Sequence, residues 1–242
     1  MTVVLTGADG FLGWHIRLRL HALGIHDVVP VTRGTWSGLP AIVGGADVVI
    51  HVAGVNRADD DTLVSSNAQL AHDVAAAVRG SSRAVRIIYA NSIHDGLGTA
   101  YGRGTAAARE VLQAVSDEID GHFVDVRLPN IFGEHCRPHY NSFVATFVEA
   151  VRTGERPRVV DRQVGLLHAQ GAAQALIDGL TTTRHRIDPA VTEVSVQEVL
   201  HLLNDFKSSY DRGEFPDLST EFRINLFNTS RASLFPDNAP TQ

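Results

Sequence analysis

The sequence predicts an α/β protein with a doubly wound parallel sheet, and three observations lead to this fold class. A short apolar run at the N-terminus breaks into a series of glycines, Gly7, Gly10 and Gly13. Strand-like and helix-like segments then alternate over the first 130 residues. The 242 residues are 44% hydrophobic and 20% charged, which is typical of a globular protein. This alternation favours parallel strands with helices on both faces and with ligands at the carboxyl ends of the strands.

The glycine series lies between a predicted strand at residues 3–5 and a predicted helix at 14–23. Gly7 allows a tight turn, Gly10 lets a pyrophosphate approach the backbone, and Gly13 lets helix and strand pack closely. The start of the helix offers free N–H groups to phosphates. The motif therefore predicts a Rossmann-like dinucleotide site, and a plain strand-to-helix turn is the alternative. The predicted cofactor residues here are Gly7, Gly10, Phe11, Leu12 and Gly13.

The remaining elements follow from periodicity and turn residues. Further strands are expected at 28–32, 47–52, 85–90 and 122–127, and Ala-rich helices at 68–78 and 105–114. After a loop at 130–141 we expect helices at 142–151, 172–180 and 196–206, an extended segment at 159–170, and a weakly patterned polar tail after Ser209. This pattern predicts a single domain over residues 1–242, with a dinucleotide-binding core at 1–130 and a small C-terminal substrate lobe at 131–242.

Composition excludes several classes of function. The net charge of −6 argues against a nucleic-acid partner. No apolar stretch reaches the ~18 residues of a membrane span, so no membrane partner is expected. Cys136 is the only cysteine, which fits a reducing cytoplasm. The 12 histidines show no metal-ligand spacing, so we expect no metal site.

The end of the second strand indicates which cofactor binds. NAD sites usually carry an acid there, whereas a basic residue accommodates the 2′-phosphate of NADP. Here the strand ends at Arg33 with no acid beside it, which predicts NADP(H) rather than NAD(H); a solvated surface arginine is the alternative. Asp47 is a candidate acceptor for the adenine amino group, or else a turn-forming acid. Ala53 and Gly54 would let the backbone pass close to the cofactor.

Several segments resemble one known enzyme family. They are TGADGFLG at 6–13, DVVIHVAG at 47–54, Asn91-Ser92 after a strand, Tyr101-Gly102 at the opening of a helix, and RLPNIFG at 127–133. Together they resemble the extended short-chain dehydrogenases/reductases, or NAD-dependent epimerase/dehydratase family. A narrower resemblance, through HVAGVNR at 51–57, CRPHYNSFVATF at 136–147 and VDR at 160–162, is to the reductase domain of capsular-polysaccharide enzymes that make UDP-N-acetyl-L-fucosamine. The sequence holds no counterpart of their zinc-containing cupin domain.

The resemblance implies a catalytic set with one departure. The family uses a Ser or Thr, a Tyr, and a Lys four residues after the Tyr. Ser92 and Tyr101 match, but Thr105 stands at the lysine position. The resemblance implies an NADPH-dependent reductase of a nucleotide-linked 4-keto sugar, with Tyr101 as the acid, Ser92 polarising the carbonyl, and an atypical site at Thr105. Two alternatives stay open: an NADP-dependent epimerase, dehydratase or other altered reaction on a similar substrate, and a non-catalytic NADP-binding protein.

The resemblance also implies binding residues and an assembly. Asn130 is assigned to the cofactor. The predicted contacts to a nucleotide-sugar-like substrate are Asn91, His94, His135, Arg137, Asn141 and Arg162. The alternative for the residues after 130 is a polar surface loop. A homodimer is expected, because related proteins pair the helices that correspond to 68–78 and 105–114; burial against the protein's own sheet is the alternative reading of their alanines.

Overall fold

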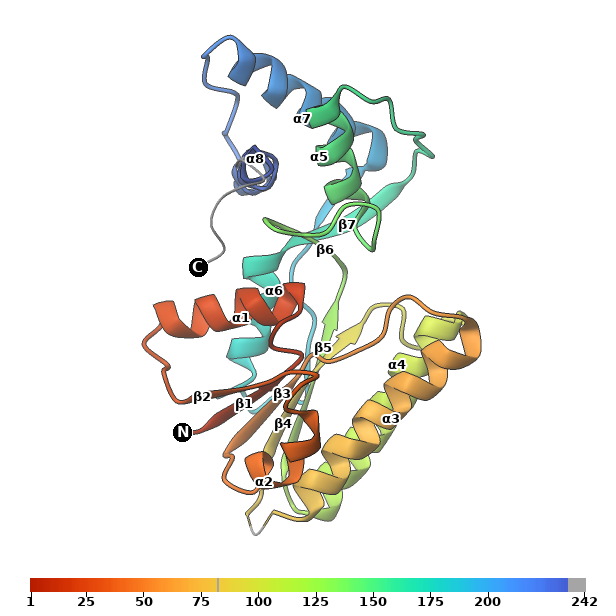
Figure 1. Ribbon diagram of the computed structural model, residues 1–242, viewed down its shortest axis with the longest axis vertical. Coiled ribbons are helices and arrows are strands. Elements are labelled where there is room, and N and C mark those ends of the chain that lie inside the picture. The colour runs from red at the N-terminus through yellow and green to blue at the C-terminus, as the bar shows by residue number, and fades with distance from the viewer. Residues whose placement is uncertain (82, 235–242) are drawn as a thin grey trace. The chain divides into compact units, whose positions relative to one another are not determined.

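The structure is a computed structural model that describes residues 1–81 and 83–234. It divides into two compact units (Figure 1). The first unit comprises Met1–Leu128 and Gln170–Pro189, and the second comprises Pro129–Ala169 and Ala190–Gln242. The chain thus leaves the first unit after Leu128, returns for one helix and one short strand, and leaves again. The sequence had indicated a change near residue 130 but not this return.

The first unit contains a six-stranded sheet in which every pairing is parallel. Its strand order is β2 (Val28–Val31), β1 (Val3–Thr6), β3 (Val48–His51), β4 (Arg86–Ser92), β5 (His122–Leu128) and β8 (Arg186–Ile187). The order reverses between β1 and β3, which is the point at which doubly wound sheets bind ligands. The predicted fold class is confirmed.

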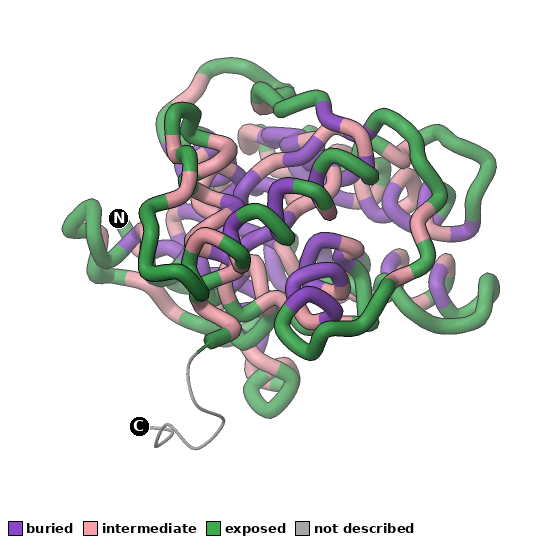
Figure 2. Tube along the Cα trace, turned by 90° about the horizontal axis from the view of Figure 1, so that it is seen from above, coloured by how far each residue is buried: buried purple, intermediate pink, exposed green. Residues whose placement is uncertain are grey.

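Helices cover both faces of this sheet (Figure 1). One face carries α1 (Phe11–Ala22) and α6 (Ala169–Asp178), which are joined by a hydrogen bond of 2.8 Å from Arg19 Nε to Gln174 Oε1. The other face carries α2 (Leu39–Val43), α3 (Asp60–Arg79) and α4 (Ala100–Glu118). A short 3₁₀ turn, η1 (Trp36–Gly38), precedes α2. Along these helices buried and exposed residues alternate, as expected for amphipathic helices (Figure 2).

Capping residues explain why α3 and α4 begin earlier than the alanine runs predicted. Asp59 accepts a hydrogen bond from the Thr62 N–H, and Thr99 accepts one from the Gly102 N–H. Each side chain satisfies a main-chain donor that the first helical turn leaves open. As a consequence, Tyr101 and Thr105 both lie within the first two turns of α4.

The second unit has its own small sheet and core. Its strands are β6 (Asn130–Phe132), β7 (Gln163–His168) and β9 (Thr192–Ser195), with β6 and β7 parallel and β7 and β9 antiparallel. Three helices accompany them: α5 (Phe143–Thr153), α7 (Val196–Asp211) and α8 (Glu221–Ala232). The expected polar tail after Ser209 therefore contains a helix, and its Leu226 is fully buried in the core of this unit.

Within the described parts of the chain, no helix is long and apolar enough to cross a bilayer. The same residues contain no group of three or more His, Cys, Asp or Glu side chains arranged to hold a metal ion.

Candidate active site

The glycine turn after β1 brings the ends of two strands together. Gly7 has φ +70°, and a Cβ there would lie 2.8 Å from the main-chain nitrogen of Ala53, just beyond β3. At Gly13 a Cβ would overlap the Gly7 carbonyl oxygen. Both positions therefore require glycine, one for its backbone conformation and both for the close approach. The turn consequently sits at the carboxyl ends of β1 and β3.

The start of α1 lies directly behind this turn. Gly10 is the N-cap, so no side chain caps the helix, and its first turn contains no acidic residue. The main-chain N–H groups of Phe11, Leu12 and Gly13 are at the positive end of the helix dipole. An anionic group fits such an end without electrostatic conflict. The residues present thus suit the pyrophosphate of a dinucleotide.

A buried histidine, absent from the predicted site, ties the glycine turn to β3. His51 Nδ1 lies 2.7 Å from Thr6 Oγ1, and that hydroxyl also accepts a hydrogen bond from the Ala53 N–H. Burial lowers the pKa of His51 to about 4, so its ring is neutral near pH 7. Its ring stacks on Tyr89 of β4, with centroids 5.7 Å apart. Ala53 and Gly54 follow β3 at this edge, where a cofactor would pass.

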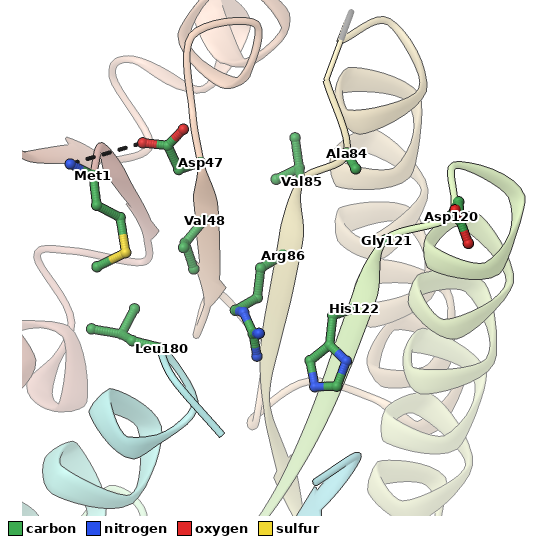
Figure 3. Close-up of a pocket in the computed structure, with 10 residues that line it drawn as sticks. All are labelled: Met1, Asp47, Val48, Ala84, Val85, Arg86, Asp120, Gly121, His122 and Leu180. Carbon is green, nitrogen blue, oxygen red and sulfur yellow. Dashed lines mark ion pairs between the residues drawn. The ribbon is translucent and has the colours of Figure 1, made fainter. Parts of the chain in front are cut away.

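The structure contradicts the adenine role predicted for Asp47. This residue precedes β3, at the amino end of the sheet, and its carboxylate accepts from the Thr2 N–H at 2.8 Å and pairs with Arg83 at 3.1 Å. The glycine turn is at the opposite edge. Asp47 lines a hollow of about 390 Å³ at the amino ends of β3, β4 and β5, and Figure 3 draws the residues around it. Ligands of doubly wound sheets bind at the carboxyl ends, so this hollow is not the nucleotide site.

Arg33 lies in the turn after β2, on the carboxyl side of the sheet. Arg33 is exposed, and its side chain makes no hydrogen bond or ion pair with the residues that the structure describes. Because β2 is hydrogen-bonded to β1, this turn neighbours the glycine turn. The guanidinium is therefore on the edge where a 2′-phosphate would need it.

Ser92, His94 and Tyr101 come from the end of β4, the turn after it and the start of α4. Ser92 Oγ accepts a hydrogen bond of 3.1 Å from the His94 N–H. The His94 and Tyr101 rings meet edge to face, with centroids 6.4 Å apart. Gly102 makes this possible, because a Cβ there would overlap the carbonyl oxygens of His94 and Leu97. The glycine after Tyr101 thus lets the turn that follows β4 pack against the start of α4.

Tyr101 and Thr105 occupy an uncharged environment. Burial raises the pKa of Tyr101 above its ordinary value. Thr105 is 4% exposed. The neighbouring arginines are engaged elsewhere: Arg103 donates to the Gly98 carbonyl at 2.7 Å, and Arg109 pairs with Asp95 at 2.8 Å. A phenol that stays neutral keeps its proton and can donate it to a ligand.

The amide of Asn91 is committed within the protein, which argues against the predicted substrate contact. Its Nδ2 donates to Asp95 Oδ2 at 2.7 Å and to Asp125 Oδ1 at 2.8 Å, and its Oδ1 accepts from the Ser92 N–H. The residue is 3% exposed. Asn91 therefore braces the site rather than facing a ligand.

The other predicted binding residues belong to the second unit. Asn130 is half-buried on β6, where its amide donates to the Gly165 carbonyl at 3.3 Å. The Arg137 guanidinium lies 5.7 Å from the Tyr140 ring centroid. Burial raises the pKa of the Cys136 thiol, which disfavours a thiolate. Four of the candidate substrate-binding residues are exposed: His135, Arg137, Asn141 and Arg162.

Comparisons with known proteins agree with this architecture. The chain is 39% identical to the UDP-2-acetamido-2,6-beta-L-arabino-hexul-4-ose reductase of Pseudomonas aeruginosa over 149 residues, 61% of this chain and 40% of that protein. Among solved structures, it is similar to the capsular polysaccharide assembling protein CapF of Staphylococcus aureus (TM-score 0.80, 25% identity, 96% of this chain and 64% of that one). It also shares the fold of the UDP-N-acetylglucosamine 4-epimerase of Bacillus cereus (TM-score 0.80, 16% identity, 99% of both chains).

The chain thus spans less than two thirds of the length of the reductase and of CapF. A family model, in contrast, matches most of this chain, from residue 3 to residue 177. That stretch contains the glycine turn, the elements from β1 to β4, and the Ser92–Tyr101 pair. The chain belongs to the NAD-dependent epimerase/dehydratase family.

Proposed function

We propose that the chain is an NADPH-dependent reductase of a nucleotide-linked 4-keto sugar. One observation carries the proposal: a half-buried tyrosine with a raised pKa lies next to the turn that begins at Ser92, at the carboxyl edge of a dinucleotide-type sheet. The name of the relative from Pseudomonas aeruginosa supports the choice of reduction and of a UDP-linked keto sugar. The presence of both hydroxyls, on Ser92 and Tyr101, serves no purpose in a protein that only binds the cofactor.

When bound, NADPH would supply the hydride that reduces the carbonyl carbon of the substrate. The Tyr101 hydroxyl gives its proton to the carbonyl oxygen, and the Ser92 hydroxyl donates a hydrogen bond to the same oxygen as negative charge develops. The ketone becomes a secondary alcohol, and the phenolate regains its proton from solvent. A raised pKa keeps Tyr101 protonated at neutral pH, so the acid is ready for each turnover.

The cofactor preference rests on Arg33. The exposed guanidinium beside the glycine turn has a geometry that can hold a 2′-phosphate through two parallel hydrogen bonds. No acid stands at the end of β2 to hold a free 2′-hydroxyl. We therefore infer NADP(H) rather than NAD(H).

We assign the substrate lobe to the second unit, within a single domain of the family. Its exposed arginines, Arg137 and Arg162, suit a diphosphate, and the Asn141 amide suits hydroxyls or a base edge. A cytoplasmic location is proposed with this function, because the chain has a single cysteine and the reaction consumes reduced nicotinamide.

We also propose a homodimer formed by α3 and α4. These helices pack against each other, and part of each bears on the sheet: Ala71, Ala75 and Ala108 are buried. Other alanines remain at least partly accessible, namely Ala68, Ala76, Ala106, Ala107 and Ala114. Small residues on a helix pair allow a second pair to approach closely about a two-fold axis.

Thr105 counts against one alternative, an epimerase or dehydratase reaction on a similar substrate. With no cation at this position, deprotonated Tyr101 is disfavoured, and reactions that begin by oxidising an alcohol need that base. An epimerase or dehydratase would therefore have to use another group, and a protein without turnover would need none.

One assay separates these functions. The protein is incubated with NADPH and a panel of UDP- and TDP-linked 4-keto sugars, and the products are weighed by mass spectrometry. A reductase adds two hydrogens to one substrate. An isomer of unchanged mass indicates epimerisation, and a loss of water indicates a dehydratase. Tight NADPH binding with no product from any sugar argues for the non-catalytic alternative.

A further inference from the structure

The turn that carries Ser92 and His94 is held by a carboxylate that the proposed chemistry does not use. Asp95 lies in this turn, and its side chain is only 8% exposed. A single oxygen, Oδ2, accepts hydrogen bonds from Arg109 Nε at 2.8 Å and from Asn91 Nδ2 at 2.7 Å. The Asp95 carbonyl oxygen accepts a third bond from Arg127 at 3.0 Å. One residue of the turn is thereby fixed to β4, β5 and α4.

Each partner of Asp95 leads to a residue of the proposed site. Asn91 receives the Ser92 N–H on its own oxygen, at 2.8 Å, so the amide that holds Asp95 also fixes the backbone of Ser92. Arg109 lies eight residues beyond Tyr101 on α4, which places both on one side of the helix. The pair Asp95–Arg109 therefore joins the Ser92 turn to the helix that presents Tyr101.

The buried carboxylates of this cluster depend on the arginines beside them. Asn91 Nδ2 donates to Asp95 and to Asp125, whose carboxyl is itself largely buried. Burial and the nearby Asp95 raise the pKa of Asp125. Arg127 and Arg109 both offset the charge of Asp125, and Arg109 also pairs directly with Asp95. Arg109 is therefore engaged with these carboxylates and is not available to Tyr101. A buried carboxylate that lost its arginine would move toward water or become protonated, and the turn would move with it.

We propose that Asp95 and Arg109 form a clamp that positions Ser92 and Tyr101 for proton transfer, so that both are positioning residues. The inference rests on the proposed reductase function. A reacting geometry is sensitive to displacements of about 1 Å, which can cost on the order of 100-fold in rate. The clamp controls such displacements for two groups on different elements.

The test compares Asp95→Asn, Arg109→Gln and the double variant with the wild type, under NADPH and the keto sugar that the protein reduces. We expect each single change to lower kcat about tenfold or more, with the Kd for NADPH within about twofold of the wild type. The double variant should be no slower than the worse single variant, because the two residues act as one unit.

A matched control lies on the same helix. Arg79 and Glu118 form an ion pair of 2.8 Å between the far ends of α3 and α4. Glu118→Gln removes a carboxylate from an arginine just as Asp95→Asn does, and it should leave kcat unchanged. Thermal melts of every variant give the folded fraction, so that a loss of kcat larger than the loss of folded protein identifies positioning.

A second measurement does not depend on turnover. With ¹³C-labelled tyrosine, the Tyr101 signal is identified by its absence in Tyr101→Phe. We expect Asp95→Asn to shift this signal and Glu118→Gln to leave it in place. A wild-type protein that binds NADPH but reduces no 4-keto sugar would contradict the proposed function, and the shifted signal would still support the clamp. An unmoved signal, or kcat within about twofold of the wild type in Asp95→Asn, would overturn the clamp.

Discussion

The hydroxyl of Thr105 donates a hydrogen bond of 3.1 Å to the carbonyl oxygen of Gly102, one turn earlier in α4. The side chain therefore serves its own helix and not a ligand. Its carbonyl accepts a long hydrogen bond, 3.4 Å, from the buried Tyr89 hydroxyl. Position 105 is thus closed and neutral in this chain. If Tyr101 is the acid, as proposed, residue 105 supplies no cation to it from one turn away.

Arg33 provides the test of cofactor preference. Arg33→Glu replaces a cation beside the glycine turn with an anion, so NADPH binding should weaken by about tenfold or more while NADH binding is unchanged or improved. Calorimetry with both cofactors measures this. Arg184→Glu is the matched control, because that exposed arginine precedes β8 at the amino edge of the sheet. Tighter binding of NADH than of NADPH by the wild type would show that the preference is wrong.

The dimer prediction concerns exposed Ala76 on α3. Ala76→Glu adds a charge to the proposed interface without touching the core, so it should produce folded monomers. These monomers should melt within a few degrees of the wild-type protein at a concentration low enough for it to be monomeric. Light scattering at micromolar concentration should give the dimer mass for the wild type and the monomer mass for the variant. Ala41→Glu, an equally exposed alanine on α2, should stay dimeric. A wild-type monomer would exclude the assembly.

His51 makes stability depend on pH. Its pKa is lowered to about 4 by burial, while the unfolded chain titrates near 6.5. Below about pH 6.5 the imidazole therefore binds a proton in the unfolded state but not in the folded state. The free energy of unfolding decreases as the pH is lowered, until the pKa of the folded state is reached. Between neutral pH and about pH 5 this amounts to about 2 kcal/mol of unfolding free energy.

Urea unfolding at both pH values measures the His51 effect. Burial also lowers the pKa of His122, so the comparison is with His51→Gln, which keeps the His122 contribution. The variant should be less stable at pH 7 but lose less on acidification. An equal pH dependence in both proteins would contradict the assignment to His51.

The sequence predicted the parts of the site that depend on local backbone geometry. The glycine turn could be read because Gly7 and Gly13 leave no room for a Cβ, and a motif reports such a restriction directly. The adenine role of Asp47 failed although the acid was expected at the start of a strand, because the amino ends of parallel strands lie at the edge opposite the glycine turn. There the carboxylate binds Thr2 and Arg83 instead of a ligand.

The Asp95 cluster and α8 could not be predicted, for a different reason. Asp95, Asn91 and Arg109 meet only after a turn and a helix have folded over β4, so no periodicity links them. Helix α8 has few apolar residues, and its stability comes from Leu226 and its neighbours packing in the second unit's core. Tertiary packing of this kind overrides weak local preference.

The last prediction concerns Tyr101 and Thr105 together. Tyr101→Phe should abolish reduction while NADPH binds nearly as tightly as in the wild type, because the variant lacks only the proton to be transferred. In the wild type, kcat should not fall as the pH rises from neutral into the mildly alkaline range, since burial raises the pKa of Tyr101 above its ordinary value and the acid form persists. Thr105→Lys would place a cation one turn from the phenol, lower that pKa, and move the alkaline loss of reduction to lower pH. The same variant should speed alcohol oxidation, which needs the phenolate.

Thr105→Met controls for side-chain size at this buried position. Wild-type turnover by Tyr101→Phe would show that another group is the acid, and identical pH profiles for the lysine and methionine variants would show that position 105 does not act on Tyr101.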